Sequence, residues 1–249
     1  MFANYFSFIP RLLPAGMLIL GFGISNSVMP ANAAETTPAV ASPGVIVIGF
    51  VGGFVRRNDA VHQEVQLAAH LRKQYPAGMQ VKIFENRQGR QARREVLEML
   101  DADRDGELSD RERRAARIVI YGHSWGASEG VTLARTLGKD AIPVLLTIQV
   151  DSVAKLGEDD RWIPANVSQA VNFYQVNGLL HGRREILAAD GSRTQILGNY
   201  RVDYKTKRVS CDGFPWYAQM FMSPHIKIEC DPSVWNQVES RISSKLPAD

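Results

Sequence analysis

The chain has 249 residues, of which 45% are hydrophobic and 22% charged, and its formal net charge is +3. A chain of this length and composition can bury a sizeable core, most simply as one domain. The small net charge argues against a nucleic-acid partner, because nucleic-acid-binding proteins carry a clear basic surplus.

The first 33 residues have the features of a secretory signal. Arg11 is their only charged residue, an apolar stretch follows at residues 12–24, and an Ala-Asn-Ala sequence ends at Ala33. The apolar stretch is shorter than the roughly 20 residues that a membrane span needs. We therefore predict cleavage after Ala33, a secreted or periplasmic protein without a stable membrane span, and a flexible leader at residues 34–44.

Strands and helices are predicted to alternate along the mature chain, residues 45–249. Apolar runs predict strands at residues 45–51, 79–84, 118–121, 144–150 and 169–176, and apolar residues at helical spacing predict helices at 62–73, 91–100, 125–138 and 232–246. Residues 178–210 are polar and remain unassigned. Continuous apolar runs between helices are typical of parallel strands covered on both faces. The predicted fold class is an open, mostly parallel α/β sheet with helices on both faces.

The strand at 118–121 ends in the most informative motif of the chain, Gly-His-Ser-Trp-Gly at residues 122–126. A serine hydroxyl is a poor nucleophile unless it is held exposed beside a base, and a tight turn between a strand and a helix holds it in that way. The two glycines leave room for the neighbouring backbone. The motif therefore predicts Ser124 as a nucleophile.

With this turn, the strand order and the polar residues downstream, residues 45–246 resemble the α/β-hydrolase superfamily, including its lipases and esterases. In that superfamily the nucleophile, acid and histidine follow one another in this order. The acid expected here is Asp151, directly after the strand at 144–150, and the histidine is His225, on irregular chain ahead of the closing helix. Many members place the acid one strand later, so the alternatives are Asp190, Asp203 and Asp212 for the acid, and His181 for the histidine.

The resemblance implies roles for the backbone beside Ser124. His225 would take the proton from Ser124, and the resulting tetrahedral oxyanion needs backbone N–H donors. One donor is expected from Trp125, directly after the nucleophile. The other is expected from Val51 or Phe50, in the glycine-rich segment at the end of the first predicted strand.

Two cysteines, Cys211 and Cys230, are predicted to form a disulfide, because an even pair in an exported protein is more often bridged than free. The bridge would close a loop that contains His225 and would help to fix its position. An aromatic and Met-rich stretch at residues 214–222 lies inside this loop. It is expected either to line an acyl pocket or to pack beneath the last loop.

A second motif lies between the helix at 91–100 and the strand at 118–121. Residues 101–112 match an EF-hand calcium loop, with a glycine at the sixth position and a short leaving helix at 110–116. The predicted ligands are Asp101, Asp103, Asp105, the carbonyl of Glu107, Ser109 through a water molecule, and Glu112. We predict a structural role for Ca²⁺ here, and the alternative is a solvated acidic loop.

The sequence thus predicts an exported serine hydrolase that cleaves a carboxylic ester, with a small molecule or a lipid as the acyl ester substrate. Thioesters, amides and acyl transfer stay open. The alternative function is a non-catalytic extracytoplasmic calcium-binding interaction module on the same fold. No organic cofactor is predicted, because the sequence has no dinucleotide fingerprint, phosphate loop or spaced zinc-ligand cluster.

Overall fold

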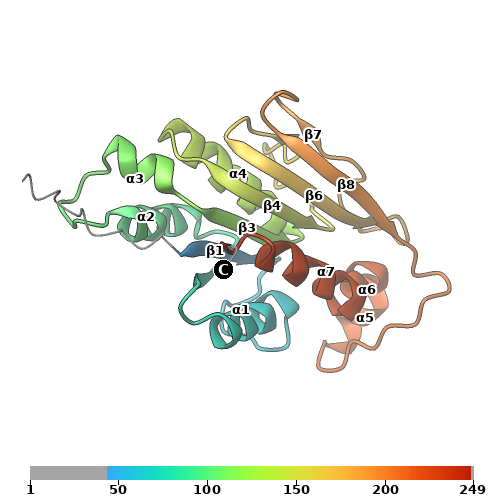
Figure 1. Cartoon of the computed structure of the whole chain (residues 1–249). Helices are drawn as coiled ribbons and strands as arrows, with labels where there is room; N and C mark the ends of the chain where they lie inside the picture. Colours follow the sequence, from blue (N-terminus) through green and yellow to red (C-terminus); the bar gives the residue numbers. More distant parts are fainter. Residues whose placement is uncertain (1–43, 248–249) are drawn as a thin grey trace, which may run out of the picture. The chain divides into compact units, whose positions relative to one another are not determined.

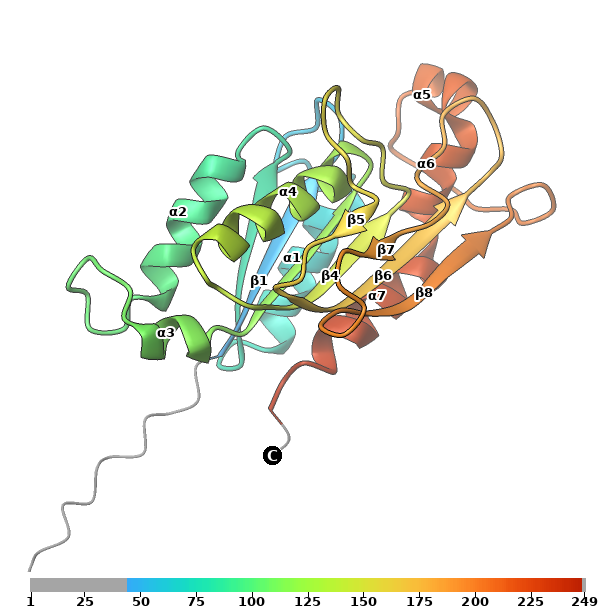
Figure 2. The same ribbon diagram turned by 90° about the horizontal axis from the view of Figure 1, so that it is seen from above.

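The computed structural model describes residues 44–247, which are drawn in colour in Figures 1 and 2. The predicted signal sequence, the cleavage after Ala33 and almost all of the leader lie outside the described residues. Within the described part of the chain, no helix combines the length and the apolar character that crossing a bilayer requires.

A six-stranded sheet with all neighbouring strands parallel forms the centre of residues 44–247, in the order β2-β1-β3-β4-β6-β8. The strands are β1 (Val45–Val51), β2 (Met79–Glu85), β3 (Ile118–His123), β4 (Val144–Val150), β6 (Val167–Gln175) and β8 (Gln195–Val202). This confirms the predicted fold class. The strand order changes direction between β1 and β3, and ligands of such sheets bind beside the carboxyl ends of the strands at this point.

Helices cover both faces of the sheet (Figure 2). One face is covered by α1 (Gln63–Gln74) and α7 (Pro232–Ser243), and the other by α2 (Gly89–Leu100) and α4 (Trp125–Lys139). Successive residues of a strand point to opposite faces, so each strand contributes to two apolar cores. In β1, Val47 packs on the α1 side and Ile48 on the α2 side.

The smaller elements lie around this sheet. A separate pair of short parallel strands consists of β5 (Trp162–Ile163) and β7 (Leu187–Ala188). The helix α3 (Asp110–Ala115) precedes β3, and α5 (Trp216–Phe221) and α6 (Ser223–Cys230) lie beyond the carboxyl ends of β6 and β8 (Figure 2).

Two segments differ from the sequence prediction. The unassigned residues 178–210 contain β8, which lies at the edge of the six-stranded sheet beside β6 and is partly exposed along its length, so it lacks a continuous apolar pattern. The expectation that His225 lies on irregular chain was wrong, because His225 is in α6. Pro224 stands in the first turn of this helix, where proline fits the backbone. Ile228, in the same helix, is fully buried.

Candidate active site

Ser124 stands at the end of β3 in a conformation that non-glycine residues rarely adopt, with φ 55° and ψ −127°. Close packing imposes this turn. A Cβ atom added to Gly126 would lie 2.3 Å from the Phe50 carbonyl oxygen, and one added to Gly122 would lie 2.6 Å from the carbonyl carbon of Gly126. Backbone strain of this kind persists only where the surrounding structure enforces it, and it concentrates at functional sites.

Asp151 follows β4 directly, again with a positive φ of 44°, and its side chain is fully buried. One carboxylate oxygen accepts hydrogen bonds from the backbone N–H groups of Gly182 (2.8 Å) and Gln175 (3.2 Å), and the other accepts one from the Gln175 side chain (2.8 Å). The structure therefore holds this carboxylate in one orientation. Gln175, a polar residue at the end of β6, was not singled out from the sequence, although strand ends are where such partners gather.

His225 joins the other two side chains. Its Nδ1 lies 2.7 Å from Asp151 Oδ2, and its Nε2 lies 2.9 Å from Ser124 Oγ. A carboxylate can only accept, so in the neutral ring Nδ1 carries the hydrogen, and Nε2 is then the acceptor for the serine hydroxyl. The structure thus brings together the three residues selected from the sequence.

The alternative acids and histidine make other contacts. Asp190 bonds to Ser192 in its own turn, and Asp203 bonds to Lys205 and Arg201 nearby in sequence. Asp212 is exposed, and the nearest polar contact of the His181 ring is the Gly182 carbonyl oxygen at 3.4 Å.

The backbone beside Ser124 borders the space in front of this residue. Phe50 and Val51, the residues expected to supply the second oxyanion donor, are buried within β1 and are not among the residues that line this space. The strand continues through them, and residues 52–55 line this space instead. Trp125, the first residue of α4 and the other expected donor, also lines this space.

Asn86 holds the loop at residues 52–55 in place through hydrogen bonds. The sequence analysis did not identify this residue. The Asn86 side-chain amide donates hydrogen bonds to the carbonyl oxygens of Val51 (3.3 Å) and Gly53. Lys155 in turn donates to the Asn86 carbonyl oxygen and forms an ion pair with Glu129. Among the described residues, the backbone N–H groups of Gly53 and Phe54 donate no hydrogen bond, so they are available to a ligand.

A cavity of about 550 Å³ opens in front of Ser124 and His225. Its lining is mainly apolar, from residues 52–55, Val153, Leu180, Phe214, Pro215, Ala218, Met222 and Ile226. The aromatic and Met-rich stretch is therefore divided, because Phe214 and Met222 line the cavity whereas Met220 and Phe221 are exposed. A mainly apolar cavity with a few polar groups is the usual form of a small-molecule site.

The predicted disulfide between Cys211 and Cys230 is present, with 5.4 Å between the Cα atoms. Cys230 is the last residue of α6, so the bridge ties the end of the helix that carries His225 to the chain entering this region.

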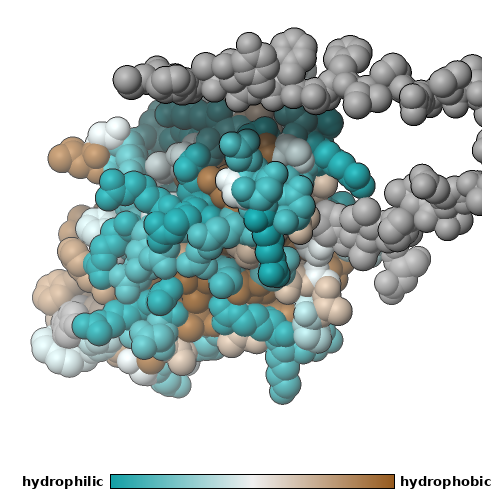
Figure 3. All heavy atoms as spheres, turned by 90° about the vertical axis from the view of Figure 1, so that its left-hand side faces the viewer, coloured by the Kyte–Doolittle hydropathy of each residue, from teal (hydrophilic) through white to brown (hydrophobic). Residues whose placement is uncertain are grey.

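The loop at residues 101–112 lies at the other end of the sheet from Ser124. It leads through α3 into the first residue of β3, and the six residues of that strand separate it from Ser124 by ~20 Å. Oxygen atoms of Asp101, Asp103 and Asp105 lie within 4.8 Å of one another. The surface on this side of the molecule, seen in Figure 3, is largely hydrophilic.

The local geometry of this loop is ordered by its own carboxylates. Gly106 has a φ of 87°, and its N–H donates to Asp101 Oδ2 at 3.0 Å. Glu112 accepts hydrogen bonds from the Ser109 hydroxyl (2.7 Å) and from the N–H groups of Ser109 and Ala102 (both 2.8 Å), and these donors lower the Glu112 pKa to about 2. The other oxygen of Asp101 is buried without a hydrogen-bond partner among the described residues.

The protein combines a parallel α/β sheet with a strained serine, a histidine and a buried aspartate. The three side chains form one hydrogen-bonded chain at the carboxyl edge of the sheet, and this combination defines the structural class of the protein. No protein-family model and no curated protein matches the sequence. Among solved structures, the chain is similar to a YdeN-like hydrolase from Pectobacterium atrosepticum, with 15% sequence identity, a TM-score of 0.43, and coverage of 82% of this chain and 94% of that chain.

Two further solved structures have a similar arrangement. One is RedJ, with 10% identity, a TM-score of 0.37, and coverage of 81% of this chain and 97% of that chain. The other is an acetyl xylan esterase, with 11% identity, a TM-score of 0.39, and coverage of 82% of this chain and 99% of that chain. At these identities the likeness concerns the arrangement of the chain, and the roles of the side chains are argued from this structure alone.

Proposed function

We propose that this protein is a serine hydrolase that cleaves carboxylic esters. The observation that carries the proposal is the position of the His225 ring, with Nε2 2.9 Å from Ser124 Oγ and Nδ1 2.7 Å from Asp151 Oδ2. A serine hydroxyl that donates to an imidazole oriented by a buried carboxylate is an activated nucleophile. The apolar cavity in front of it supports an acyl group as the part of the substrate that is bound.

The reaction follows from this geometry. Ser124 Oγ attacks the ester carbonyl while His225 Nε2 takes its proton, and Asp151 stabilises the charged ring. The N–H groups of Trp125 and of Gly53 or Phe54 donate to the oxyanion. His225 then gives the proton to the departing alcohol, which leaves an acyl-serine, and a water molecule activated by the same ring releases the acid.

A series of p-nitrophenyl esters of increasing acyl length tests this function, together with labelling of the serine by a fluorophosphonate. Wild-type protein is expected to hydrolyse the esters and to be labelled, and Ser124→Ala is expected to lose both. Ser168→Ala is the matched control, because Ser168 is exposed in β6 and makes no contact with the site. Folded wild-type protein that neither turns over nor is labelled would overturn the proposal and favour the non-catalytic calcium-binding module.

We further propose that residues 101–112 bind a structural Ca²⁺. The residues fit this ion, because the loop gathers hard oxygen ligands and leaves one buried oxygen of Asp101 without a partner. Asp101, Asp103, Asp105, the carbonyl of Glu107 and Glu112 would hold it, with Ser109 acting through water. An isolated loop of this kind is expected to bind with a Kd on the order of 0.1–1 mM, as in extracellular modules.

Calcium titration with the melting temperature as readout tests this site. Wild-type protein is expected to melt higher as Ca²⁺ is added, and Glu112→Gln is expected to lose the response. Glu98→Gln on the exposed face of α2 is the control that keeps it. Unchanged melting temperature and activity across chelation and titration would overturn the calcium proposal and leave the hydrolase proposal intact.

We also propose that the protein is exported and cleaved after Ala33, and N-terminal sequencing of the secreted protein tests this.

A further inference from the structure

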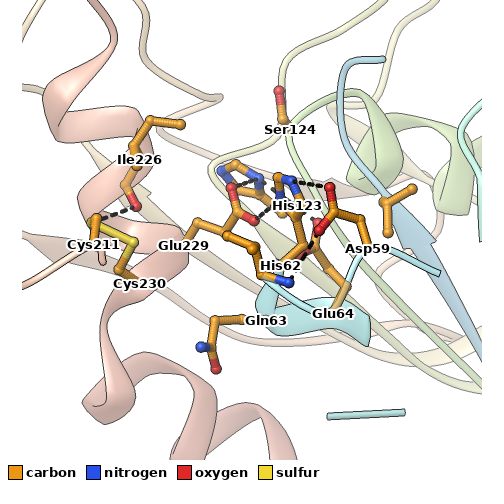
Figure 4. A network of polar contacts seen from close by, with 12 residues as sticks. Asp59, His62, Gln63, Glu64, His123, Ser124, Cys211, Ile226, Glu229 and Cys230 are labelled. Carbon is orange, nitrogen blue, oxygen red and sulfur yellow. Dashed lines mark hydrogen bonds and ion pairs between the residues drawn. A yellow bond between two sulfur atoms is a disulfide. The ribbon is translucent and has the colours of Figure 1, made fainter. Parts of the chain in front are cut away.

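Behind the catalytic histidine lies a group of four titratable side chains for which the proposed reaction has no use. His62 precedes α1, Glu64 is in its first turn, His123 ends β3, and Glu229 is in α6. Figure 4 shows these side chains converging from the three elements, whereas the Ser124 side chain points away from them. We call them the buried His–Glu cluster.

The ligand atoms of the cluster are close together. His62 Nδ1 lies 2.5 Å from Glu229 Oε1, and His62, Glu64 and Glu229 each place one nitrogen or oxygen within 4.8 Å of the other two. His123 Nδ1 lies 3.3 Å from Glu229 Oε2 and 3.9 Å from Glu64 Oε1. In a tetrahedral site with metal–ligand distances of 2.0–2.2 Å, ligand atoms are separated by ~3.3 Å. The three measured spacings lie on both sides of this value, and the group whose ligand atoms all lie within 4.8 Å of one another consists of His62, Glu64 and Glu229.

The two carboxylates of the cluster have too few partners for their burial. Glu64 is 0% exposed and Glu229 2% exposed. Among the described residues, no N–H or O–H group donates a hydrogen bond to either side-chain oxygen of Glu64. Its carboxylate faces that of Glu229, and two carboxylates can hydrogen-bond only by sharing a proton. No lysine or arginine in the described part of the chain forms an ion pair with either glutamate. Buried carboxylates are stable only when they are paired, metal-bound or protonated. A divalent cation would balance the negative charge of the two buried carboxylates and accept the lone pair of a neutral imidazole.

We propose that the buried His–Glu cluster binds one divalent transition-metal ion of the Zn²⁺ class through His62 Nδ1, Glu64, Glu229 and His123 Nδ1. Two imidazole nitrogens among the ligands favour Zn²⁺ over Ca²⁺ or Mg²⁺, which prefer oxygen. The other ring nitrogen of His62, Nε2, lies 3.8 Å from Asp59 Oδ2, which is beyond hydrogen-bond range.

The cluster has an entry path and a mechanical consequence. His62, His123, Glu229 and Asp59 all line the cavity in front of Ser124, so the ion reaches its ligands from that side. Glu229 is four residues after His225 on α6, and the rings of His123 and His225 have centroids 4.5 Å apart. The ion would therefore tie α1, β3 and α6 together and act as a positioning element for the helix that carries His225.

Metal binding by the full chain is the test, and it does not depend on ester hydrolysis. Protein stripped with dipicolinate is titrated with Zn²⁺ in a calorimeter, with excess Ca²⁺ present to occupy the loop at residues 101–112. We expect one Zn²⁺ per chain, a melting temperature that rises with Zn²⁺ concentration, and with Co²⁺ the strong visible absorption of a four-coordinate site. Wild-type protein that binds no Zn²⁺ overturns the proposal and indicates a pair of glutamates that share a proton.

Variants locate the site. Glu64→Gln keeps the size of the side chain and is expected to weaken Zn²⁺ binding at least ~10-fold and to abolish the Zn²⁺-dependent rise in melting temperature. Glu239→Gln makes the same chemical change in α7, where Glu239 pairs with the exposed His70, and is expected to bind as wild type does. Equal binding by Glu64→Gln and wild type would place the ion elsewhere and overturn the assignment. If Glu64→Gln does not fold, the Co²⁺ spectrum of His62→Ala decides in its place.

Discussion

Asp151 and Glu64 are both fully buried carboxylates that lie beside histidines, and their surroundings are opposite. Asp151 accepts hydrogen bonds from the N–H groups of Gly182 and Gln175, from the Gln175 amide and from His225 Nδ1. Neither oxygen of Glu64 accepts any among the described residues. Because a buried charge needs donors or a cation in place of water, the fold itself compensates Asp151, whereas Glu64 needs a proton or an ion from outside.

The largest expected effect comes from Asp151→Asn, which removes the charge and leaves the shape. An amide NH₂ would face His225 Nδ1, so the ring would have to carry its hydrogen on Nε2 and could no longer accept from Ser124. We expect kcat for a p-nitrophenyl ester to fall roughly 10³–10⁴-fold, as in other triads. Asp190→Asn, at an exposed turn, is the control without effect. A loss of less than ~10-fold would mean that another residue acts as the acid.

Removing the disulfide tests whether the catalytic site and the buried His–Glu cluster both depend on the position of α6, since this helix carries both His225 and Glu229. Replacing Cys211 and Cys230 by serine together is expected to lower the free energy of unfolding by about 3 kcal/mol, because the bridge closes a loop between residues 19 apart. Activity should fall as well. Guanidinium chloride unfolding with and without reductant measures the first effect, and the variant should not respond to reductant. Full activity and unchanged stability would show that the disulfide neither stabilises the protein nor positions α6.

Asp160 offers an intermediate case, a fully buried carboxylate that is compensated by a charged partner. It accepts hydrogen bonds from Ser152 Oγ (2.5 Å) and Arg183 Nε (2.9 Å). Asp160→Ala is expected to lower the free energy of unfolding by about 2–3 kcal/mol, somewhat below the usual loss for a broken buried pair, because Arg183 is 35% exposed and regains water.

Asp159→Ala is the matched control for this variant. Asp159 lies 3.7 Å from the same guanidinium group, but its side chain is 57% exposed. The expected loss in urea unfolding is below about 1 kcal/mol, as for surface ion pairs. Equal losses of stability in the two variants would show that burial of the carboxylate does not determine how much the Asp160–Arg183 pair stabilises the protein.

How much of this could be predicted from the sequence depends on how local each signal is. The bounds of β1 and β4 were predicted as observed, because strands buried on both faces are continuous apolar runs. The edge strand β8 has no such run, since it is partly exposed, and it was missed. The second oxyanion donor was expected from Phe50 or Val51, whereas residues 52–55 line the space in front of Ser124. An apolar pattern locates the strand but does not show which backbone N–H group beside its end faces a cavity.

The two polar sites differ in the same way. Ser124, Asp151 and His225 could be selected because each follows or precedes a recognisable element and their chain order matched a known family. Nothing similar marks Glu64, since an acidic residue in the first turn of a helix is common. His62 and Glu229 are 167 residues apart, so their contact exists only after folding. The absence of a spaced zinc motif in the sequence therefore says little about ligands that different elements bring together.

The smallest expected effect depends on pH and extends the comparison of buried carboxylates to Asp231. Asp231 is 1% exposed at the start of α7, and its carboxylate accepts hydrogen bonds from Tyr204 (2.8 Å), Lys207 (2.5 Å) and Ser233. Burial alone would raise its pKa, but these donors outweigh burial and lower it. The pKa in the folded protein thus lies below that of the unfolded chain. The resulting stabilisation is present at neutral pH and is lost as the pH falls through the folded-state value.

Asp231→Asn keeps a good helix-capping side chain and removes the charge. We expect it to be about 1–2 kcal/mol less stable than wild type at pH 7, with the difference shrinking below about pH 4, where the wild-type carboxylate also takes up protons. Urea unfolding at both pH values measures this. Glu229 is expected to behave oppositely, because burial raises its pKa and makes its ionisation unfavourable for the folded state as the pH rises. A difference between Asp231→Asn and wild type that is independent of pH would mean that the donors, rather than the charge, stabilise the start of α7.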